Sequence, residues 1–212
     1  MNLRTRVKIC GITRTEDAVE AARLGVDAIG LVFYENSPRH LSIAQAQQVC
    51  QALPGFVTVV SLFLNPEAGL VKDVLASVPV DLLQFHGNES GDFCRSFNRP
   101  YIKALGMADD QDLEQRANEY PDARGVLLDS HASGAAGGTG EAFDWASIPQ
   151  PFRQSIILAG GLSPQNIAEA IKTVRPYAVD LSSGVEAAPG IKDASLMAQL
   201  MKEVKRVDCE NS

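Results

Sequence analysis

The segment VKICGITRTEDAVEAARLGVDAIGLVF, residues 7–33, contains the repeating unit that decides the fold. Its first four and last six residues are largely apolar, and the residues between them have helical spacing. Thr13 with Glu16 predicts a capping box at the start of the helix, and Gly25 predicts a left-handed turn at its end. The segment therefore predicts a strand, a helix and a second strand.

The same alternation continues to the end of the chain. Ser42 with Gln45 predicts a second capping box, and Asn65 and Ser163 each precede a proline suited to a first helical turn. The last helix is expected to begin at Asp193, with DCENS as a frayed tail. Eight strands are predicted, at residues 7–10, 28–33, 56–64, 80–85, 101–105, 125–128, 156–159 and 178–181.

This pattern in 212 residues predicts an α/β fold, a single (β/α)8 TIM barrel, with one domain over residues 1–212. An open doubly wound sheet would share the alternation, so periodicity alone does not establish closure. The fourth and sixth helices are the weak units. ESGDFCRSF contains a glycine and few good helix formers, and EAFDWASI is soon followed by prolines.

The composition is that of a compact globular domain, with 45% hydrophobic and 21% charged residues. A net charge of −7 argues against nucleic acid as a partner, because nucleic acid requires basic surfaces. The longest apolar region, 56–64, is too short to cross a membrane, and the N-terminus lacks an apolar stretch of signal-peptide length. We therefore expect a cytoplasmic protein with no membrane contact.

The cysteines are widely scattered, at positions 10, 50, 94 and 209, and the chain has no CxxC pair. Its three histidines show no metal-binding spacing. We therefore expect reduced thiols and no metal site.

Cys10 and Asp129 each end an apolar run that precedes a polar turn. In a closed parallel barrel such residues meet at the mouth, where these barrels place their chemistry. Lys8 lies two residues before Cys10 and so shares its face of the strand, and a nearby ammonium favours thiolate. A thiolate and a carboxylic acid predict proton transfer. The alternatives are an apolar filler role for Cys10 and a local turn cap for Asp129.

Two glycine-bearing turns, ILAGGLSP and VDLSSGVE, follow the last two predicted strands. Barrels of this kind often bind phosphate there, because backbone N–H groups can approach an anion closely. Gly160, Gly161, Ser183 and Gly184 are therefore predicted to bind phosphate, with a tight turn as the alternative for either segment alone. The loop SHASGAAGGTGE, residues 130–141, is a candidate lid.

Three further polar residues lie at or after strand ends. Arg39 suggests recognition of a carboxylate or phosphate, because its planar fork holds two oxygens, and a solvated surface charge is the alternative. His86, at the end of LLQFHG, is a second-rank candidate for substrate binding. Asp180 either serves a hydroxyl of the ligand or balances an interior lysine such as Lys8.

In order along the chain, KICGIT, SPRHLS, LQFHGNE, LLDS, GGTGEAFDW, LAGGLSPQN and VDLSSGVE closely resemble the signature segments of the phosphoribosylanthranilate isomerase family of tryptophan biosynthesis. The resemblance spans nearly the whole chain, and the ordered set is far more specific than any single motif. It implies an Amadori rearrangement of a small phosphosugar-anthranilate substrate without cofactor or metal. A monomer is expected, with a homodimer as the alternative.

The resemblance also implies roles for individual residues. Asp129 would protonate the ribose ring oxygen, Cys10 would remove a proton from the second sugar carbon, and Arg39 would hold the anthranilate carboxylate. The two glycine-bearing turns would hold the phosphate. Ser61 departs from the pattern, because the family commonly carries glycine there. We expect Ser61 to alter packing at the barrel mouth or to crowd the aromatic ring.

Three alternatives compete with this interpretation. The histidine-pathway aminoaldose isomerase is expected to carry an aspartate in place of Cys10. Indole-glycerol-phosphate synthase should show a catalytic lysine and glutamate set that these strand ends lack. A phosphosugar-binding barrel without activity would not need both Cys10 and Asp129, so the sequence favours the isomerase.

Overall fold

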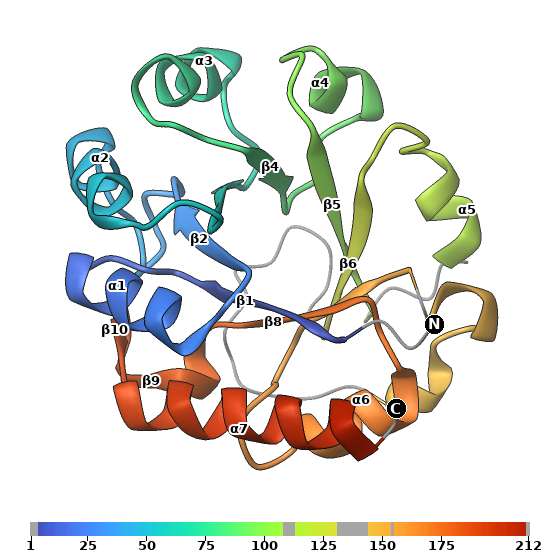
Figure 1. The fold of residues 1–212 in the computed structure, drawn as a ribbon. Helices are drawn as coiled ribbons and strands as arrows, with labels where there is room; N and C mark the ends of the chain where they lie inside the picture. The colour runs from blue at the N-terminus through green and yellow to red at the C-terminus, as the bar shows by residue number, and fades with distance from the viewer. Residues whose placement is uncertain (1–3, 108–112, 131–143, 154, 211–212) are drawn as a thin grey trace.

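A computed structural model of the chain describes residues 4–107, 113–130, 144–153 and 155–210. Eight parallel strands close into a barrel in sequence order, and helices surround it (Figure 1). The predicted TIM barrel is confirmed, and the open sheet is excluded. The barrel strands are β1 (Arg6–Cys10), β2 (Ala28–Val32), β3 (Thr58–Phe63), β4 (Leu82–Phe85), β5 (Tyr101–Gly106), β6 (Gly125–Asp129), β7 (Ile157–Leu158) and β8 (Ala178–Leu181).

The helices form the outer layer of the molecule. The weak fourth and sixth units are short, as expected: α4 has five residues, and two 3-10 turns lie between β6 and β7 in the described part of that connection. The α-helices are α1 (Thr15–Leu24), α2 (Ile43–Ala52), α3 (Ala68–Ser77), α4 (Gly91–Arg95), α5 (Leu113–Asn118), α6 (Ile167–Val174) and α7 (Ala194–Glu210). The 3-10 turns are η1 (Trp145–Ser147), η2 (Gln150–Phe152) and η3 (Ser183–Val185).

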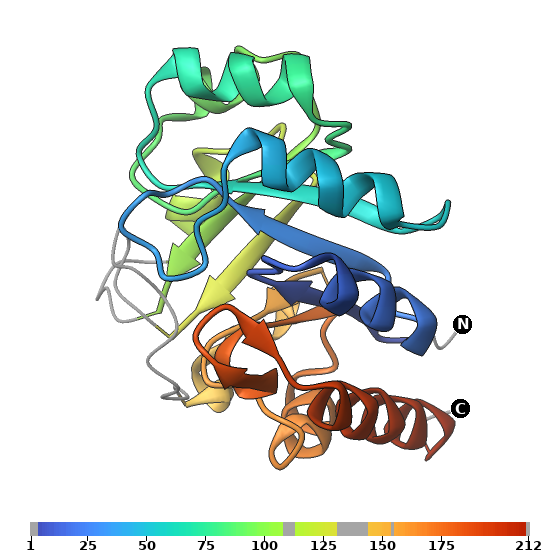
Figure 2. The ribbon, with the colours of Figure 1, turned by 90° about the vertical axis from the view of Figure 1, so that its left-hand side faces the viewer.

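A two-stranded hairpin, β9 (Glu186–Ala188) and β10 (Ile191–Lys192), follows β8. In the side view of Figure 2 it lies toward the end of the barrel to which the strand arrows point. In this family of folds that end carries the functional site. No helix among the described residues is both long enough and apolar enough to cross a lipid bilayer.

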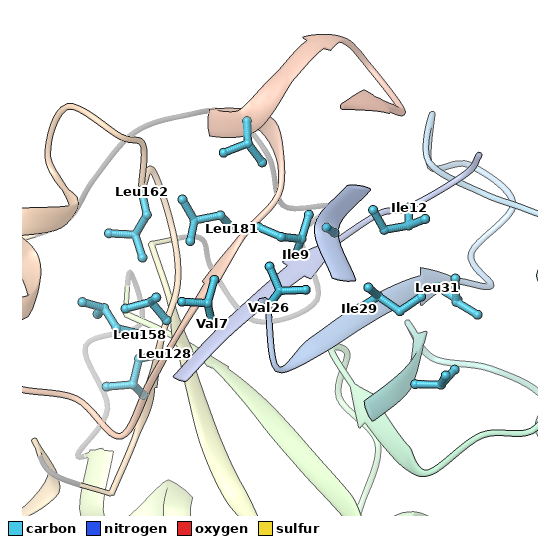
Figure 3. Packing of buried hydrophobic residues seen from close by; sticks show 14 of the residues in the cluster. Val7, Ile9, Ile12, Val26, Ile29, Leu31, Leu128, Leu158, Leu162 and Leu181 are labelled. Atoms are coloured by element: carbon cyan, nitrogen blue, oxygen red, sulfur yellow. The ribbon is translucent and has the colours of Figure 1, made fainter. Parts of the chain in front are cut away.

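The strands read as apolar runs because both of their faces are buried. Alternate residues point inward, where Val60, Ile102 and Leu127 belong to a small cluster inside the barrel. The others point outward and pack against the helices in a larger cluster, of which Figure 3 shows members such as Val7 and Leu181. Inward-facing polar residues that lie between this inner cluster and the C-terminal ends of the strands therefore point to the barrel mouth.

Two predicted helix ends are confirmed. Ser42 and Gln45 form a complete capping box at the start of α2. Gly25 ends α1 in the left-handed conformation, with a φ of 88°. The start of α7 after Asp193 and its buried stripe of Leu200, Val204 and Val207 are also as expected.

The other three predicted helix starts are wrong, because the polar groups involved make different contacts. Thr13 donates its hydroxyl hydrogen bond to a backbone carbonyl in the β9–β10 turn. The Asn65 side chain accepts a hydrogen bond from the backbone N–H of Asn88. Ser163 donates its backbone N–H to the side chain of Asn166 within a turn, and α6 begins only after that turn.

The predicted frayed tail needs correction as well. α7 continues through Glu210, and the last two residues of the predicted tail, Asn211 and Ser212, lie outside the described residues. Within this last turn Asp208 accepts hydrogen bonds from the backbone N–H and the hydroxyl of Thr5, at 2.9 and 2.8 Å. The last helix is therefore tied to the start of β1.

Candidate active site

A cavity of about 840 Å³, which includes space open to solvent, lies at the C-terminal ends of the strands. Its apolar wall comes mainly from β2, β3 and the loops that follow them. Eight of the nine predicted site residues line the cavity, and Gly184 does not. The eight are Cys10, Arg39, His86, Asp129, Gly160, Gly161, Asp180 and Ser183.

The order of the strands places these groups in sequence around the mouth. Asp129 ends β6, the Gly160 turn follows β7, the Ser183 turn follows β8, and Cys10 ends β1. Arg39 lies in the next connection, between β2 and α2. The two glycine-bearing turns therefore lie between the carboxyl group and the thiol. A ligand anchored on these turns would have one of these groups on each side.

Cys10 occupies a tightly packed position beside β2. Its partner in the strand register is Gly30, and a Cβ atom on Gly30 would lie 2.7 Å from the Cys10 sulfur. Only glycine leaves room for the thiol in this arrangement. Our sequence analysis did not select Gly30, although a glycine inside an apolar strand is a known sign of close approach.

The ionisation of Cys10 differs from our expectation. Burial raises the pKa of the thiol, and the charges of Lys8 and Lys192 lower it less strongly, so the pKa lies above its ordinary value. Lys8 acts in the expected direction, but it also forms a buried 2.8 Å ion pair with Asp180. Asp180 thus balances Lys8, which is one of its two predicted roles. Burial therefore favours the thiol form of Cys10 over the thiolate.

Arg39 is bound by a carboxylate of the chain itself. Its Nε and Nη2 donate to the two oxygens of Glu186, at 2.9 and 2.7 Å. Lys192 donates to the same carboxylate at 2.7 Å. Burial alone would raise the pKa of Glu186, but the two cations more than offset it, and the pKa is lowered.

This network leaves part of the Arg39 guanidinium available to a ligand. No group among the described residues accepts a hydrogen bond from Nη1 of Arg39. Glu186 and Lys192 were missed in our sequence analysis, although Glu186 is the last residue of the quoted segment VDLSSGVE. Their partner Arg39 is 147 residues away from Glu186, and no local pattern predicts such a contact.

The acid side of the cavity contains His86 and Asp129. His86 Nε2 lies 3.7 Å from Asp129 Oδ2, and the Ser130 hydroxyl donates to Asp129 Oδ1 at 3.4 Å. Burial lowers the pKa of His86, although the charge of Asp129 opposes this shift. The environment of His86 thus favours its neutral form. The predicted lid, apart from Ser130, lies outside the described residues.

The two glycine-bearing turns offer a set of backbone donors. Gly160 and Gly161 have φ values of 81° and 63°. A Cβ on Gly184 would lie 2.0 Å from the Leu162 carbonyl oxygen, so this glycine lets the second turn pack against the first. None of the backbone N–H groups of Gly160, Gly161, Ser183 and Gly184 has an acceptor in the described ranges. Such a group of donors suits a phosphate.

Ser61 does not have the predicted effect on the cavity. It is fully buried, lies between Val60 and Leu62 in β3, and is not among the residues that line the cavity. Val60 belongs to the inner cluster and Leu62 lines the cavity, so Ser61 points outward, toward the helices. The expectation that Ser61 crowds a bound aromatic ring is therefore wrong.

Comparison with known proteins identifies the family. Residues 7–203 match the family model described as N-(5'phosphoribosyl)anthranilate (PRA) isomerase. The chain belongs to this family. A curated N-(5'-phosphoribosyl)anthranilate isomerase of Nitrosococcus oceani is 54% identical over 206 residues, which cover 97% of this chain and 100% of the relative.

Solved structures of the same family have the same fold. A phosphoribosyl anthranilate isomerase in complex with reduced 1-(o-carboxyphenylamino)-1-deoxyribulose 5-phosphate is 40% identical, with a TM-score of 0.83 and coverage of 95% of this chain and 99% of that one. A structure of monomers generated from the dimeric isomerase of Thermotoga maritima is 38% identical, with a TM-score of 0.83 and the same coverage.

Proposed function

We propose that the protein is the isomerase of tryptophan biosynthesis that converts N-(5-phosphoribosyl)anthranilate to 1-(2-carboxyphenylamino)-1-deoxyribulose 5-phosphate. The observation that carries the proposal, beside family membership, is the arrangement of the cavity. A thiol and a carboxyl group flank two turns whose backbone donors suit a phosphate. This arrangement matches a substrate that needs one anchored end and two proton transfers at its sugar.

The first step opens the sugar ring. Asp129, as a carboxylic acid, donates a proton to the ribose ring oxygen, and the bond between that oxygen and the first sugar carbon breaks. The anilino nitrogen supplies the electron pair that forms a protonated imine with this carbon. Asp129 is left as a carboxylate.

The second step moves a proton from the second sugar carbon. Cys10 as thiolate accepts this proton, and the electron pair of the C–H bond forms the carbon–carbon double bond of an enolamine while the imine nitrogen is neutralised. The enolamine then tautomerises to the ketone, so the reaction has no net gain or loss of atoms or electrons. Before this step Cys10 gives up its thiol proton to solvent, and the positive imine beside the sulfur favours this loss, which offsets the effect of burial.

Binding is divided between the two ends of the cavity. The phosphate takes hydrogen bonds from the turns at Gly160, Gly161 and Ser183, with Gly184 supporting the contact between the turns. At the other end, Arg39 donates from Nη1 to the anthranilate carboxylate. The aromatic ring packs against the apolar wall, which contains Val32 and the residues Leu62, Leu64 and Leu162.

The direct test is an assay with freshly prepared phosphoribosylanthranilate, in which loss of substrate fluorescence is followed over time. The purified protein should accelerate this loss well above the spontaneous decay of the substrate. No acceleration by correctly folded protein would refute the proposed activity.

We propose a cytoplasmic monomer, which cell fractionation and sedimentation velocity would test. The homodimer is the alternative, and the fully exposed Phe56, in the turn before β3, offers a residue with which to test it. If a dimer sediments and Phe56→Ser converts it to a monomer, the homodimer replaces the monomer in this account.

A further inference from the structure

Two polar side chains, one in β4 and one directly after it, point into the barrel mouth. Gln84 and His86 are two residues apart, so they share the inward face. Gln84 is completely buried, and its amide nitrogen Nε2 lies 3.2 Å from His86 Nδ1. The other ring nitrogen of His86, Nε2, faces Asp129 Oδ2 at 3.7 Å. The three side chains thus form a row from the inside of the barrel to the carboxyl group.

The chemistry of these atoms determines where the imidazole proton lies. An amide nitrogen only donates hydrogen bonds, so the nitrogen of His86 that it contacts must carry a lone pair. In a neutral imidazole the proton is then on Nε2, the atom that faces Asp129. Burial lowers the pKa of His86, which favours this neutral form.

The opposite orientation of the amide would produce a different contact. If the Gln84 oxygen faced the ring, Nδ1 would carry the proton and Nε2 would present a lone pair to Asp129. Two acceptors would then oppose each other whenever Asp129 is ionised, as it is after the first step of the proposed mechanism. The Nε2–H form avoids this repulsion and gives the carboxylate a donor.

We propose that Gln84 is a positioning residue for the acid, acting through His86. The Gln84 amide fixes the imidazole with its proton on Nε2, and this N–H orients the carboxyl group of Asp129 toward the sugar. The 3.7 Å separation exceeds a hydrogen bond, and the proposal requires it to shorten in the complex with substrate. This inference rests on the proposed function, because it assigns a role in that reaction.

The tautomer can be measured without any change to the site. A long-range proton–nitrogen correlation spectrum of the ¹⁵N-labelled protein near neutral pH separates the two neutral tautomers from the charged ring. The signals of His86 are assigned by their loss in His86→Asn. The wild-type protein should show a proton on Nε2 and none on Nδ1. A proton on Nδ1, in either a neutral or a charged ring, would overturn the proposal.

The effect on the acid is tested with Gln84→Glu, which keeps the shape of the side chain but replaces the donor by a carboxylate. The variant should place a proton on Nδ1 of His86 and lower kcat by about 10- to 100-fold with little change in KM, because the acid loses its orientation. Gln47→Glu is the matched control, since its amide donates to the Ser77 carbonyl oxygen on the outside of the barrel. It should leave both the His86 spectrum and kcat unchanged.

Three outcomes are distinguished by this design. A neutral His86 ring with its proton on Nδ1 in Gln84→Glu, together with an unchanged kcat, would refute the positioning role. If Gln84→Glu does not fold, as judged by circular dichroism, or if its His86 ring carries both protons, Gln84→Met replaces it, and a kcat equal to that of wild type would again refute the role. Absence of isomerase activity in the wild-type protein would refute the proposed function, while its His86 spectrum would still decide the tautomer.

Discussion

The two sides of the cavity hold their proposed catalytic groups in different ways. On the Cys10 side, Lys8 and Asp180 form a buried ion pair at 2.8 Å, and Lys192, Glu186 and Arg39 form a second charged network. On the Asp129 side, the contact with His86 is 3.7 Å and that with Ser130 is 3.4 Å. The base is embedded in paired charges, whereas these two contacts of the acid are longer and are made to neutral groups.

The two sides of the cavity meet different requirements of proton transfer, namely ionisation of the base and orientation of the acid. The base must become a thiolate inside a buried site, and the cations around Cys10 act against the effect of burial on its pKa. The acid must instead be aimed at the correct oxygen, and the contacts with His86 and Ser130 restrict its orientation. Changes on the Cys10 side should therefore alter ionisation and position, and changes on the Asp129 side should alter orientation.

The largest effect is expected from Cys10→Ser. A hydroxyl group is a far weaker base than a thiolate near neutral pH, so kcat should fall by about 10⁴-fold. Binding of the reduced product analogue, measured by fluorescence titration, should remain close to that of the wild type. A variant with near-normal turnover would show that Cys10 is not the base.

Asp129→Asn should have the next largest effect. The amide keeps the shape of the side chain but cannot donate the acidic proton, so kcat should fall by about 10²- to 10³-fold with a smaller change in KM. Steady-state kinetics of the purified variant provide the measurement. A rise in KM alone would indicate that Asp129 binds substrate rather than protonating it.

Gly30→Ala tests the packing around the base. The new Cβ would lie 2.7 Å from the Cys10 sulfur, so the thiol must move, and we expect a loss of about 10- to 100-fold in kcat. The free energy of unfolding should also fall, by about 1–3 kcal/mol. Thermal unfolding and steady-state kinetics measure the two effects.

Gly125→Ala is the control for this change. A Cβ at Gly125, in β6, would meet its nearest neighbour, Ile157, at 3.6 Å, which is an ordinary contact. The isomerase activity of Gly125→Ala should stay close to that of the wild type. Equal losses of activity in the two variants would mean that any added methyl group in the barrel disturbs the site.

Glu186→Gln should produce a smaller effect, mainly on binding. The change removes the negative charge that holds Arg39 and Lys192, so Arg39 is less well placed for the substrate carboxylate and KM should rise about tenfold. Glu203→Gln, which changes an arginine-bound glutamate on α7, is the control. An unchanged KM in Glu186→Gln would exclude this positioning of Arg39.

The smallest effect is a shift in the pH dependence of thiol alkylation. Because burial raises the pKa of Cys10, the thiol form persists to higher pH than in a free cysteine, and the alkylation rate should rise with a midpoint above that of free cysteine. Mass spectrometry of the Cys10 peptide at a series of pH values measures this rate. A midpoint below that of free cysteine would mean that the ligand-free protein already holds the thiolate.

Much of the fold could be predicted from the sequence because barrel strands are buried on both faces and appear as short apolar runs. The weak fourth and sixth helical units were also recognised from their composition. The helix starts at Thr13, Asn65 and Ser163 were wrong, because a capping residue cannot be distinguished from one that bonds elsewhere. Thr13, for example, donates to the β9–β10 turn, far away in the sequence.

The site was predictable where a residue ends a strand and less so where it acts through another residue. Cys10, His86 and Asp129 could be placed at the mouth from strand position alone. Gly30 and Gln84 look like ordinary strand residues in the sequence. Their proposed roles depend on their neighbours in the barrel, which are Cys10 for Gly30 and His86 for Gln84. The direction of the Cys10 pKa was also not predictable, because the presence of Lys8 is visible in the sequence but the extent of burial is not.

The most direct test is a crystal structure of the protein with reduced 1-(o-carboxyphenylamino)-1-deoxyribulose 5-phosphate. The phosphate should lie on the turns at Gly160 and Ser183, with the Cys10 sulfur within about 3.5 Å of the second sugar carbon. The Asp129 carboxyl group should lie within hydrogen-bond distance of the former ring oxygen, on the other side of the sugar. A complex in which either group points away from the bound sugar would contradict the account.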